Sequence, residues 1–183
     1  MDYSTNYMRP TVNSKKGLID LINFTKISNI KMIEIGSFSG ESTSIFLNTN
    51  KIDKIFCIDP WMDNWSPVAI KYKYNMKDIE NIFDNRFKDD NRVIKHKGTI
   101  DTFIEKYKDL SDIDLVYIDG NHSRNFVEHD IQTTLDKIHP KFISGHDYNL
   151  KSKYLKGVVE AVNKIFDKKK IKTFCDTSWI FKL

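Results

Sequence analysis

The fold is decided by residues 32–43, Met32-Ile33-Glu34-Ile35-Gly36-Ser37-Phe38-Ser39-Gly40-Glu41-Ser42-Thr43. A short apolar run ends in an acidic residue and leads into a glycine loop and then into residues that start helices, which predicts a strand, a tight turn and a helix. Glycines let the backbone approach a ligand closely, and a helix N-terminus presents unpaired N–H groups. In an α/β sheet such a turn either holds a nucleotide-like cofactor at the carboxyl ends of the strands or is purely structural.

A second apolar strand, residues 55–58, ends at Asp59. An acid at the tip of the second strand, about 20 residues after the glycine loop, is placed to bind the two hydroxyls of a ribose, in NAD and S-adenosylmethionine alike. The NAD fingerprint is G-x-G-x-x-G, and this chain has Phe38 and Glu41 where the second and third glycines would stand. Since S-adenosylmethionine has no pyrophosphate to accommodate, the pattern favours it over NAD.

Three further motifs follow in the later part of the chain: Lys-Gly-Thr-Ile-Asp at 97–101, Asp-Leu-Val-Tyr-Ile-Asp-Gly-Asn-His at 114–122 and Ile-Ser-Gly-His-Asp-Tyr at 143–148. Together with the glycine loop and Asp59, these motifs resemble in order those of the class I S-adenosylmethionine-dependent methyltransferases. The likeness is greatest to the small-molecule and sugar O-methyltransferases related to macrocin O-methyltransferase, with their D-G-x-H-S and G-H-D-Y signatures. It covers roughly residues 15–183.

Length and composition set limits on the class of protein. The 183 residues suit one α/β domain, residues 1–183, and are too few for two ordinary domains. No apolar run approaches the ~20 residues that cross a bilayer, and the polar residues 1–16 are unlike a secretory signal. Cys57 and Cys175 fall in predicted strands, so we interpret them as buried thiols of a reducing compartment, which favours a cytoplasmic location.

The net charge of +4 comes from lysines scattered along the sequence. Only residues 168–170 form a basic run, which we expect in a solvated turn before the next strand. A nucleic-acid surface would group basic residues with aromatic ones on one face, and no such grouping is visible. The sequence therefore disfavours RNA binding.

Strands and helices are expected to alternate along the chain, after an amphipathic opening helix over residues 12–27. Strands are predicted at about 31–35, 54–58, 92–95, 113–118 and 140–145, with helices near 41–48, 77–87, 100–108, 124–137 and 155–167. Residues 171–175 and 179–183 predict a closing hairpin. The alternation predicts an α/β fold with a mostly parallel sheet. The resemblance implies a Rossmann-like three-layer sandwich with one antiparallel strand from the C-terminal hairpin.

The candidate cofactor site gathers residues from the ends of the first strands. Gly36 and Gly40 shape the loop, Glu34 orients it or attracts a cationic methionyl group, and Trp61 is the aromatic residue best placed to touch the cofactor. The resemblance implies that residues 98–101 border the adenine, although by themselves they indicate only a loop and a helix cap. The complete set is Glu34, Gly36, Ser37, Gly40, Ser42, Asp59, Trp61, Gly98, Thr99, Ile100 and Asp119.

Candidate catalytic groups follow the fourth and fifth predicted strands. Asp119 is a metal ligand, a hydrogen-bonding anchor or a helix cap. The resemblance implies a site for Mg²⁺ or another divalent metal at Asp119, His146 and Asp147, with His146 where an aspartate is common; imidazole suits softer ions than Mg²⁺. His122, three residues after Asp119, is the candidate general base if its pKa is near neutral, or a helix-start residue.

Aromatic residues gather in the loops after the second and fifth strands. Residues 60–76 contain Trp61, Trp65, Tyr72 and Tyr74, and residues 148–154 add two tyrosines. At the sheet tips such side chains form a platform for a flat or sugar-like substrate, or they pack the loops on the core.

These features predict an S-adenosylmethionine-dependent O-methyltransferase that acts on a small-molecule or sugar hydroxyl by in-line displacement at the sulfonium methyl. Asp119 and His122 are its candidate catalytic residues. Two alternatives remain open: a catalytically silent cofactor-binding or scaffold module of the same fold, and an RNA methyltransferase, for which no N-P-P-Y-type motif is present. The expected partner is the small-molecule acceptor, without nucleic acid or membrane, and a homo-oligomer is compatible with the sequence.

Overall fold

The structure, a computed structural model, describes residues 12–65, 70, 73–149 and 156–183. Within them, strands form one sheet in the order β3-β2-β1-β4-β5-β7-β6. The strands are β1 (Ile30–Ile35), β2 (Ile52–Asp59), β3 (Val93–Lys97), β4 (Leu115–Ile118), β5 (Phe142–Gly145), β6 (Lys172–Thr173) and β7 (Trp179–Lys182). The first five strands pair in parallel, and β7 runs antiparallel to both of its neighbours. The predicted α/β fold with an antiparallel C-terminal strand is confirmed.

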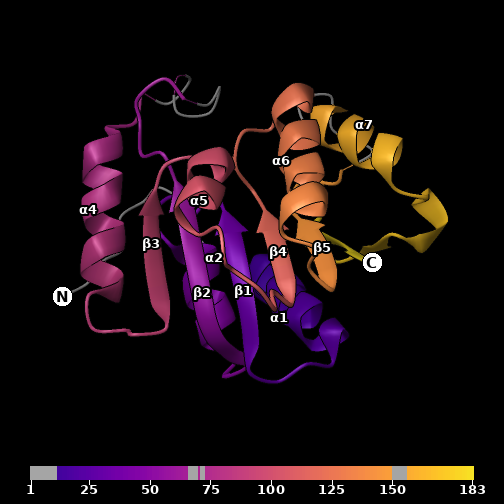
Figure 1. Cartoon of the computed structure of the whole chain (residues 1–183), viewed down its shortest axis with the longest axis horizontal. Helices are drawn as coiled ribbons and strands as arrows, with labels where there is room; N and C mark the ends of the chain where they lie inside the picture. The colour runs from indigo at the N-terminus through magenta and orange to yellow at the C-terminus, as the bar shows by residue number, and fades with distance from the viewer. Residues whose placement is uncertain (1–11, 66–69, 71–72, 150–155) are drawn as a thin grey trace.

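Helices cover both faces of this sheet. They are α1 (Val12–Thr25), α2 (Glu41–Leu47), α4 (Met76–Phe87), α5 (Ile100–Lys106), α6 (Arg124–Lys137) and α7 (Lys156–Ile165), followed by the short 3-10 helix η1 (Lys168–Lys170). In Figure 1, α5 and α6 lie in front of the sheet, and α1 and α2 lie behind it. No helix within the described ranges is long and apolar enough to cross a bilayer.

Each face of the sheet has its own hydrophobic cluster, because successive side chains of a strand point to opposite faces. In β1, Met32 packs in the cluster under α1, α2 and α4, whereas Ile33 packs in the cluster under α5, α6 and α7. In β4, Tyr117 packs in the first of these clusters and Val116 packs in the second. Since these strands are buried on both faces, they read as continuous apolar runs rather than as alternating ones.

The predicted elements are confirmed, with ends that shift by a few residues, and the largest difference is in the closing hairpin. The strand expected at 171–175 is reduced to Lys172–Thr173, and Cys175 lies exposed in the following turn. The prediction of two buried thiols is therefore correct for Cys57 and wrong for Cys175. Cys175 is exposed because it lies in a turn instead of a strand. In this turn the Phe174 carbonyl accepts a hydrogen bond from the Thr177 N–H at 3.1 Å.

Candidate active site

The loop after β1 brings two backbones together at the carboxyl ends of the strands. Gly36 has φ +92°, and a Cβ added there would lie 2.2 Å from the carbonyl oxygen of Asp119 at the end of β4. The Gly36 N–H donates to the carbonyl of Ile58 in β2 at 2.8 Å. Gly40, with φ +84°, is the N-cap of α2 and would clash with Phe87 if it carried a Cβ. Both glycines are required by backbone conformation and by close packing.

Asp59, at the end of β2, holds the glycine loop through hydrogen bonds to the backbone. Its carboxylate accepts hydrogen bonds from the backbone N–H of Phe38 at 3.0 Å and of Trp61 at 2.7 Å. Burial raises the pKa of Asp59 to about 6, although both hydrogen bonds oppose the shift. Oxygen lone pairs beyond these two bonds remain to accept hydrogen bonds from a ligand, and Asp59 lines the cavity described below.

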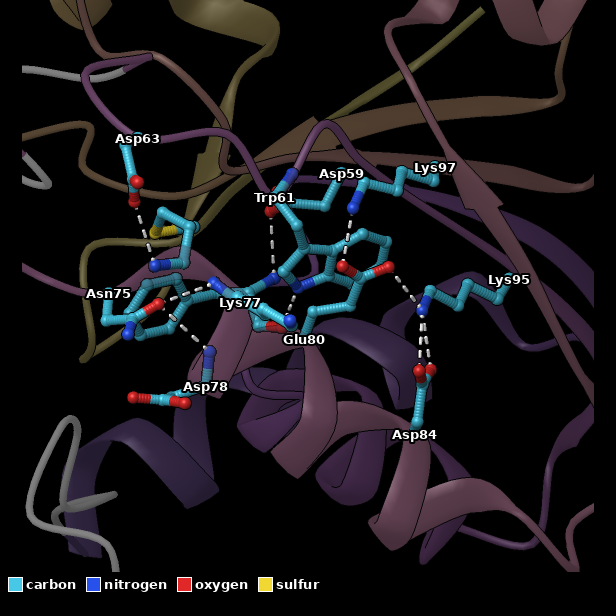
Figure 2. A network of polar contacts seen from close by, with 12 residues as sticks. Asp59, Trp61, Asp63, Asn75, Lys77, Asp78, Glu80, Asp84, Lys95 and Lys97 are labelled. Carbon is cyan, nitrogen blue, oxygen red and sulfur yellow. Dashed lines mark hydrogen bonds and ion pairs between the residues drawn. The ribbon is translucent and has the colours of Figure 1, made fainter.

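Trp61 lies beneath the loop rather than in the cavity. Its side chain is 3% exposed, its Nε1 donates to the carbonyl of Phe38 at 2.8 Å, and its ring packs on Phe83. The Lys95 ammonium lies 4.8 Å from the ring centroid and also pairs with Glu80 of α4, as Figure 2 shows. The side chain predicted to touch the cofactor thus has a supporting position, because the core under the loop needs a large apolar residue.

Glu34 also supports the loop from below. It is fully buried and accepts hydrogen bonds from the hydroxyls of Ser42 and Thr43 in the first turn of α2. Burial raises its pKa to about 7, against the effect of these hydrogen bonds. Of the two roles predicted for Glu34, the contacts match orientation of the loop, since its carboxylate does not line the cavity.

A cavity of about 380 Å³ lies along the carboxyl ends of β1, β2 and β4, within the size range of small-molecule sites. The predicted site residues that line it are Gly36, Ser37, Ser42, Asp59, Gly98, Thr99, Ile100, Asp119, His122, His146 and Asp147. Three predicted residues, Glu34, Gly40 and Trp61, lie outside this wall. The sequence therefore located the cavity, because the ends of parallel strands meet at one edge of the sheet.

Asp119, His122, His146 and Asp147 form one polar cluster in the cavity wall. His122 Nε2 lies 2.7 Å from Asp147 Oδ2 and 3.4 Å from Asp119 Oδ1. His146 Nδ1 lies 3.1 Å from Asp147 Oδ1. The hydrogen bonds of the parallel sheet continue past the ends of β4 and β5 and fix this cluster. The Asp119 N–H donates to the end of β1, and the His146 N–H donates to the end of β4. Residues predicted from two separate motifs are thus in contact.

The two carboxylates hold both imidazoles in the charged form. Burial lowers the pKa of His122, but hydrogen bonds to Asp119 and Asp147 and their negative charge outweigh it and raise the pKa to about 10. Burial likewise opposes the charge on His146, whose pKa is raised to about 9 by Asp119 and Asp147. The pKa of His122 is thus well above the near-neutral value expected from the sequence, because Asp119 and Asp147 both lie beside its ring.

The three residues expected to bind a metal lie close enough to do so. Ligand atoms of Asp119, His146 and Asp147 all lie within 4.8 Å of one another. Two carboxylates and one imidazole suit a divalent ion that accepts nitrogen as well as oxygen, such as Mn²⁺, more readily than Mg²⁺. His122 contacts the carboxylates of both Asp119 and Asp147. These side chains therefore fit an ion once the His122 ring moves away from them.

A third acid, Asp176, reaches the cluster from the turn between β6 and β7. Its side chain is 2% exposed, and one oxygen lies 3.9 Å from His146 Nε2. Its carboxylate accepts hydrogen bonds from the N–H and hydroxyl of Ser178. An added Cβ at Gly17 of α1 would overlap this carboxylate. The sequence indicated only a turn here, since nothing local signals a contact with a residue 30 positions away.

Two aromatic residues border the cavity on the side of α6. Trp65 packs edge-on against Phe126 of α6, with ring centroids 5.4 Å apart, and both line the cavity. The Asn121 side-chain amide donates to the Trp65 carbonyl at 3.0 Å and joins the loops after β2 and β4. Tyr72 and Tyr154, two of the aromatic residues predicted to form a platform, lie outside the described residues.

Two other histidines have partners outside the cluster. His129 of α6 pairs with Asp101 of α5 at 2.9 Å, in an exposed contact. This pairing also occupies Asp101, which the resemblance had associated with the adenine. His96 lies 3.0 Å from the hydroxyl of Thr102.

The comparisons with known proteins agree with this arrangement. A family model described as a methyltransferase domain matches residues 33–148. No curated protein matches the chain in sequence.

Among solved structures, TomG of Streptomyces achromogenes, an O-methyltransferase of tomaymycin synthesis in complex with SAM, matches with TM-score 0.61 and 12% identity over 94% of this chain and 82% of its own. CalS11, a TDP-rhamnose 3′-O-methyltransferase of calicheamicin biosynthesis, matches with TM-score 0.60 and 12% identity over 94% and 81%. An O-methyltransferase of Bacillus cereus in complex with SAH matches with TM-score 0.56 and 14% identity over 97% and 84%.

At these identities the solved structures show a shared fold. The family match extends from β1 to the end of the cluster and so includes the glycine loop, Asp59, Asp119 and Asp147. It spans well over half of the chain. The chain therefore belongs to the methyltransferase domain family and is a class I methyltransferase that uses S-adenosylmethionine.

Proposed function

We propose that the chain is an O-methyltransferase that methylates a hydroxyl of a small molecule, such as a sugar. The observation that carries this proposal is that one cavity contacts both Asp59, beside the glycine loop, and the cluster around His122 and Asp147. The cluster that would accept the proton therefore faces the same space as the residues that would hold the methyl donor. An enzyme that methylates a hydroxyl needs this combination.

Transfer of a methyl group to a hydroxyl releases one proton, since the sulfonium becomes a neutral thioether and the O–H bond is replaced by an O–C bond. The chain must hold the acceptor oxygen in line with the C–S bond, and such positioning supplies a large part of the rate. His122 is the candidate proton acceptor. A cationic group bound beside Asp119 would lower the pKa of His122 by like-charge repulsion and so would free Nε2 to take the acceptor proton.

Apolar side chains support a small acceptor with a ring. Met62, Trp65 and Phe126 line the cavity on the side of α6. Met62 is 50% exposed and Phe126 is 41% exposed, so an acceptor can reach them from solvent. Aromatic side chains stack on sugar or aromatic rings, and this wall would hold the ring while its hydroxyl points to His122.

An acceptor assay tests the proposed function. We expect methyl-labelled S-adenosylmethionine to label nucleotide sugars or phenols through a bond that resists the conditions that cleave methyl esters. Ribosomal and transfer RNA incubated in parallel are expected to remain unlabelled. Label in RNA alone would favour the RNA methyltransferase, and binding of S-adenosylhomocysteine without transfer to any acceptor would favour a silent module.

We further propose that Asp119, His146 and Asp147 hold a divalent metal ion, which would act as a Lewis acid on the acceptor hydroxyl. Exhaustive chelation is then expected to abolish methyl transfer, and Mn²⁺ is expected to restore it better than Mg²⁺ because of the imidazole ligand. Calorimetry of Mn²⁺ with Asp147→Asn gives a second readout, in which binding is lost. Full turnover after chelation would contradict a metal-dependent reaction and leave proton transfer to the side chains alone.

A further inference from the structure

Asp130, in the middle of α6, is a buried acid that the reaction described above does not use. Its side chain is 8% exposed, and within the described part of the chain no hydrogen bond or ion pair engages its carboxylate. It lines the same cavity as Asp59 and Asp119. Its remaining exposure is thus toward the ligand space.

Other buried aspartates show how unusual this is. Asp114 accepts a hydrogen bond from the Lys31 N–H at 3.0 Å and pairs with the Lys141 ammonium at 2.7 Å. Asp59 accepts two backbone hydrogen bonds. Leaving a buried carboxylate without a partner destabilises a protein, so an acid retained for structure alone would be expected to have one. A partner supplied by a ligand accounts for Asp130.

The neighbours of Asp130 define which part of the ligand it meets. An added Cβ at Gly120 would lie 3.9 Å from Asp130 Oδ2. Thr99 and Ile100, at the start of α5, line the same cavity. The His129–Asp101 pair joins α5 to α6 beside Asp130. Asp130 therefore lies beside the loop after β4, in the same cavity wall as the start of α5.

We propose that Asp130 recognises the adenine base of the cofactor, as a protonated carboxyl group that donates to a ring nitrogen and accepts from the exocyclic amino group. A neutral acid and an aminopurine edge each offer one donor next to one acceptor, so two parallel hydrogen bonds form. This inference rests on the assigned cofactor and not on the acceptor hydroxyl or the metal.

The electrostatics of the site are compatible with a proton on Asp130. Burial raises its pKa to about 7, while the charge of His129 on the same helix lowers it and the charge of Asp101 on α5 raises it. A neutral carboxyl is therefore available at and below neutral pH. Because a bound adenine would stabilise the protonated form, affinity for the cofactor product is expected to fall as pH rises above about 7.

Calorimetry with two ligands tests the assignment. S-adenosylhomocysteine contains the adenosine and the amino acid, whereas 5′-methylthioadenosine contains the adenosine alone. Asp130→Leu is expected to weaken both ligands by the same factor, roughly tenfold, the effect of losing hydrogen bonds in a buried site. Asp130→Asn, whose amide can both donate and accept, is expected to bind both nearly as well as the natural chain at pH 6.

The pH dependence and the stability give independent readouts. The natural chain is expected to lose affinity between pH 7 and pH 9, whereas Asp130→Asn should show a flat profile; His129→Gln should keep the loss, which excludes titration of the neighbouring imidazole. At pH 8, Asp130→Asn is expected to unfold at a higher temperature than the natural chain, because it removes a buried charge. Asp114→Asn, the matched control, should unfold at a lower temperature with unchanged affinity.

Each contrary result has a distinct meaning. Weaker binding of S-adenosylhomocysteine but not of 5′-methylthioadenosine would assign Asp130 to the methionyl ammonium group and overturn the adenine contact. Unchanged binding in Asp130→Leu, or an affinity that stays constant or rises with pH in the natural chain, would also overturn it. Failure of the natural chain to bind either ligand would instead contradict the cofactor assignment itself.

Discussion

His122→Ala is expected to lower kcat by about 10²–10⁴-fold, the usual effect of removing a general base. Affinity for S-adenosylhomocysteine should stay near the value of the natural chain, because the ion-pair contacts of His122 are with Asp119 and Asp147 and not with Asp59, the residue proposed to bind the ribose. Steady-state kinetics with the acceptor and calorimetry with the product separate the two effects.

His129→Ala is the matched control for this experiment. His129 also pairs with an aspartate, but it is exposed on α6 and lies outside the cavity wall. Its replacement is expected to leave turnover unchanged. If His122→Ala keeps most of its turnover, proton removal must be assigned to His146 or to a carboxylate of the cluster, and His122 becomes a residue that only holds Asp119 and Asp147 in place.

Gly36→Ala is expected to abolish measurable cofactor binding. A side chain at φ +92° is strained, and its Cβ would meet the Asp119 carbonyl at 2.2 Å, so the β1 loop and the end of β4 must separate. Strain and overpacking together are expected to lower the free energy of unfolding by roughly 2–6 kcal/mol. Urea denaturation and calorimetry with S-adenosylhomocysteine measure the two consequences.

Gly120→Ala tests the same explanation with the opposite expectation. The nearest heavy atom to an added Cβ at Gly120 is 3.6 Å away, an ordinary van der Waals contact. Its free energy of unfolding should therefore stay close to that of the natural chain. A Gly36→Ala protein as stable as Gly120→Ala would show that the β1 loop can move away from Asp119, and the close approach could no longer explain the glycine.

The fold could be predicted from local sequence because its signals are local. Buried parallel strands appear as short apolar runs, such as residues 32–35 and 115–118, and the helices between them have their own periodicity and caps. Where the sequence prediction failed, at Cys175, the element was a two-residue strand at the edge of the sheet. Such a strand depends on its pairing with β7 and carries almost no signal of its own.

The position of the candidate site was also determined by sequence, since parallel strands carry their terminal residues to a common edge. Gly36, Asp59, Asp119 and Asp147 each follow an apolar run, and all of them border or shape one cavity. That conclusion needs only the order of strands and loops, together with the rule that ligands bind at the carboxyl ends.

What only the tertiary structure decided is the state and surroundings of each group. The sequence placed His122 three residues from Asp119 but could not show that its ring lies 3.4 Å from Asp119 and 2.7 Å from Asp147, and these two acids together raise its pKa. The same holds for Trp61, which is packed under the loop instead of facing the cavity, and for Asp130, which no motif of the sequence indicated and which lines the cavity. Burial and charge depend on residues distant in the chain, so no local pattern encodes them.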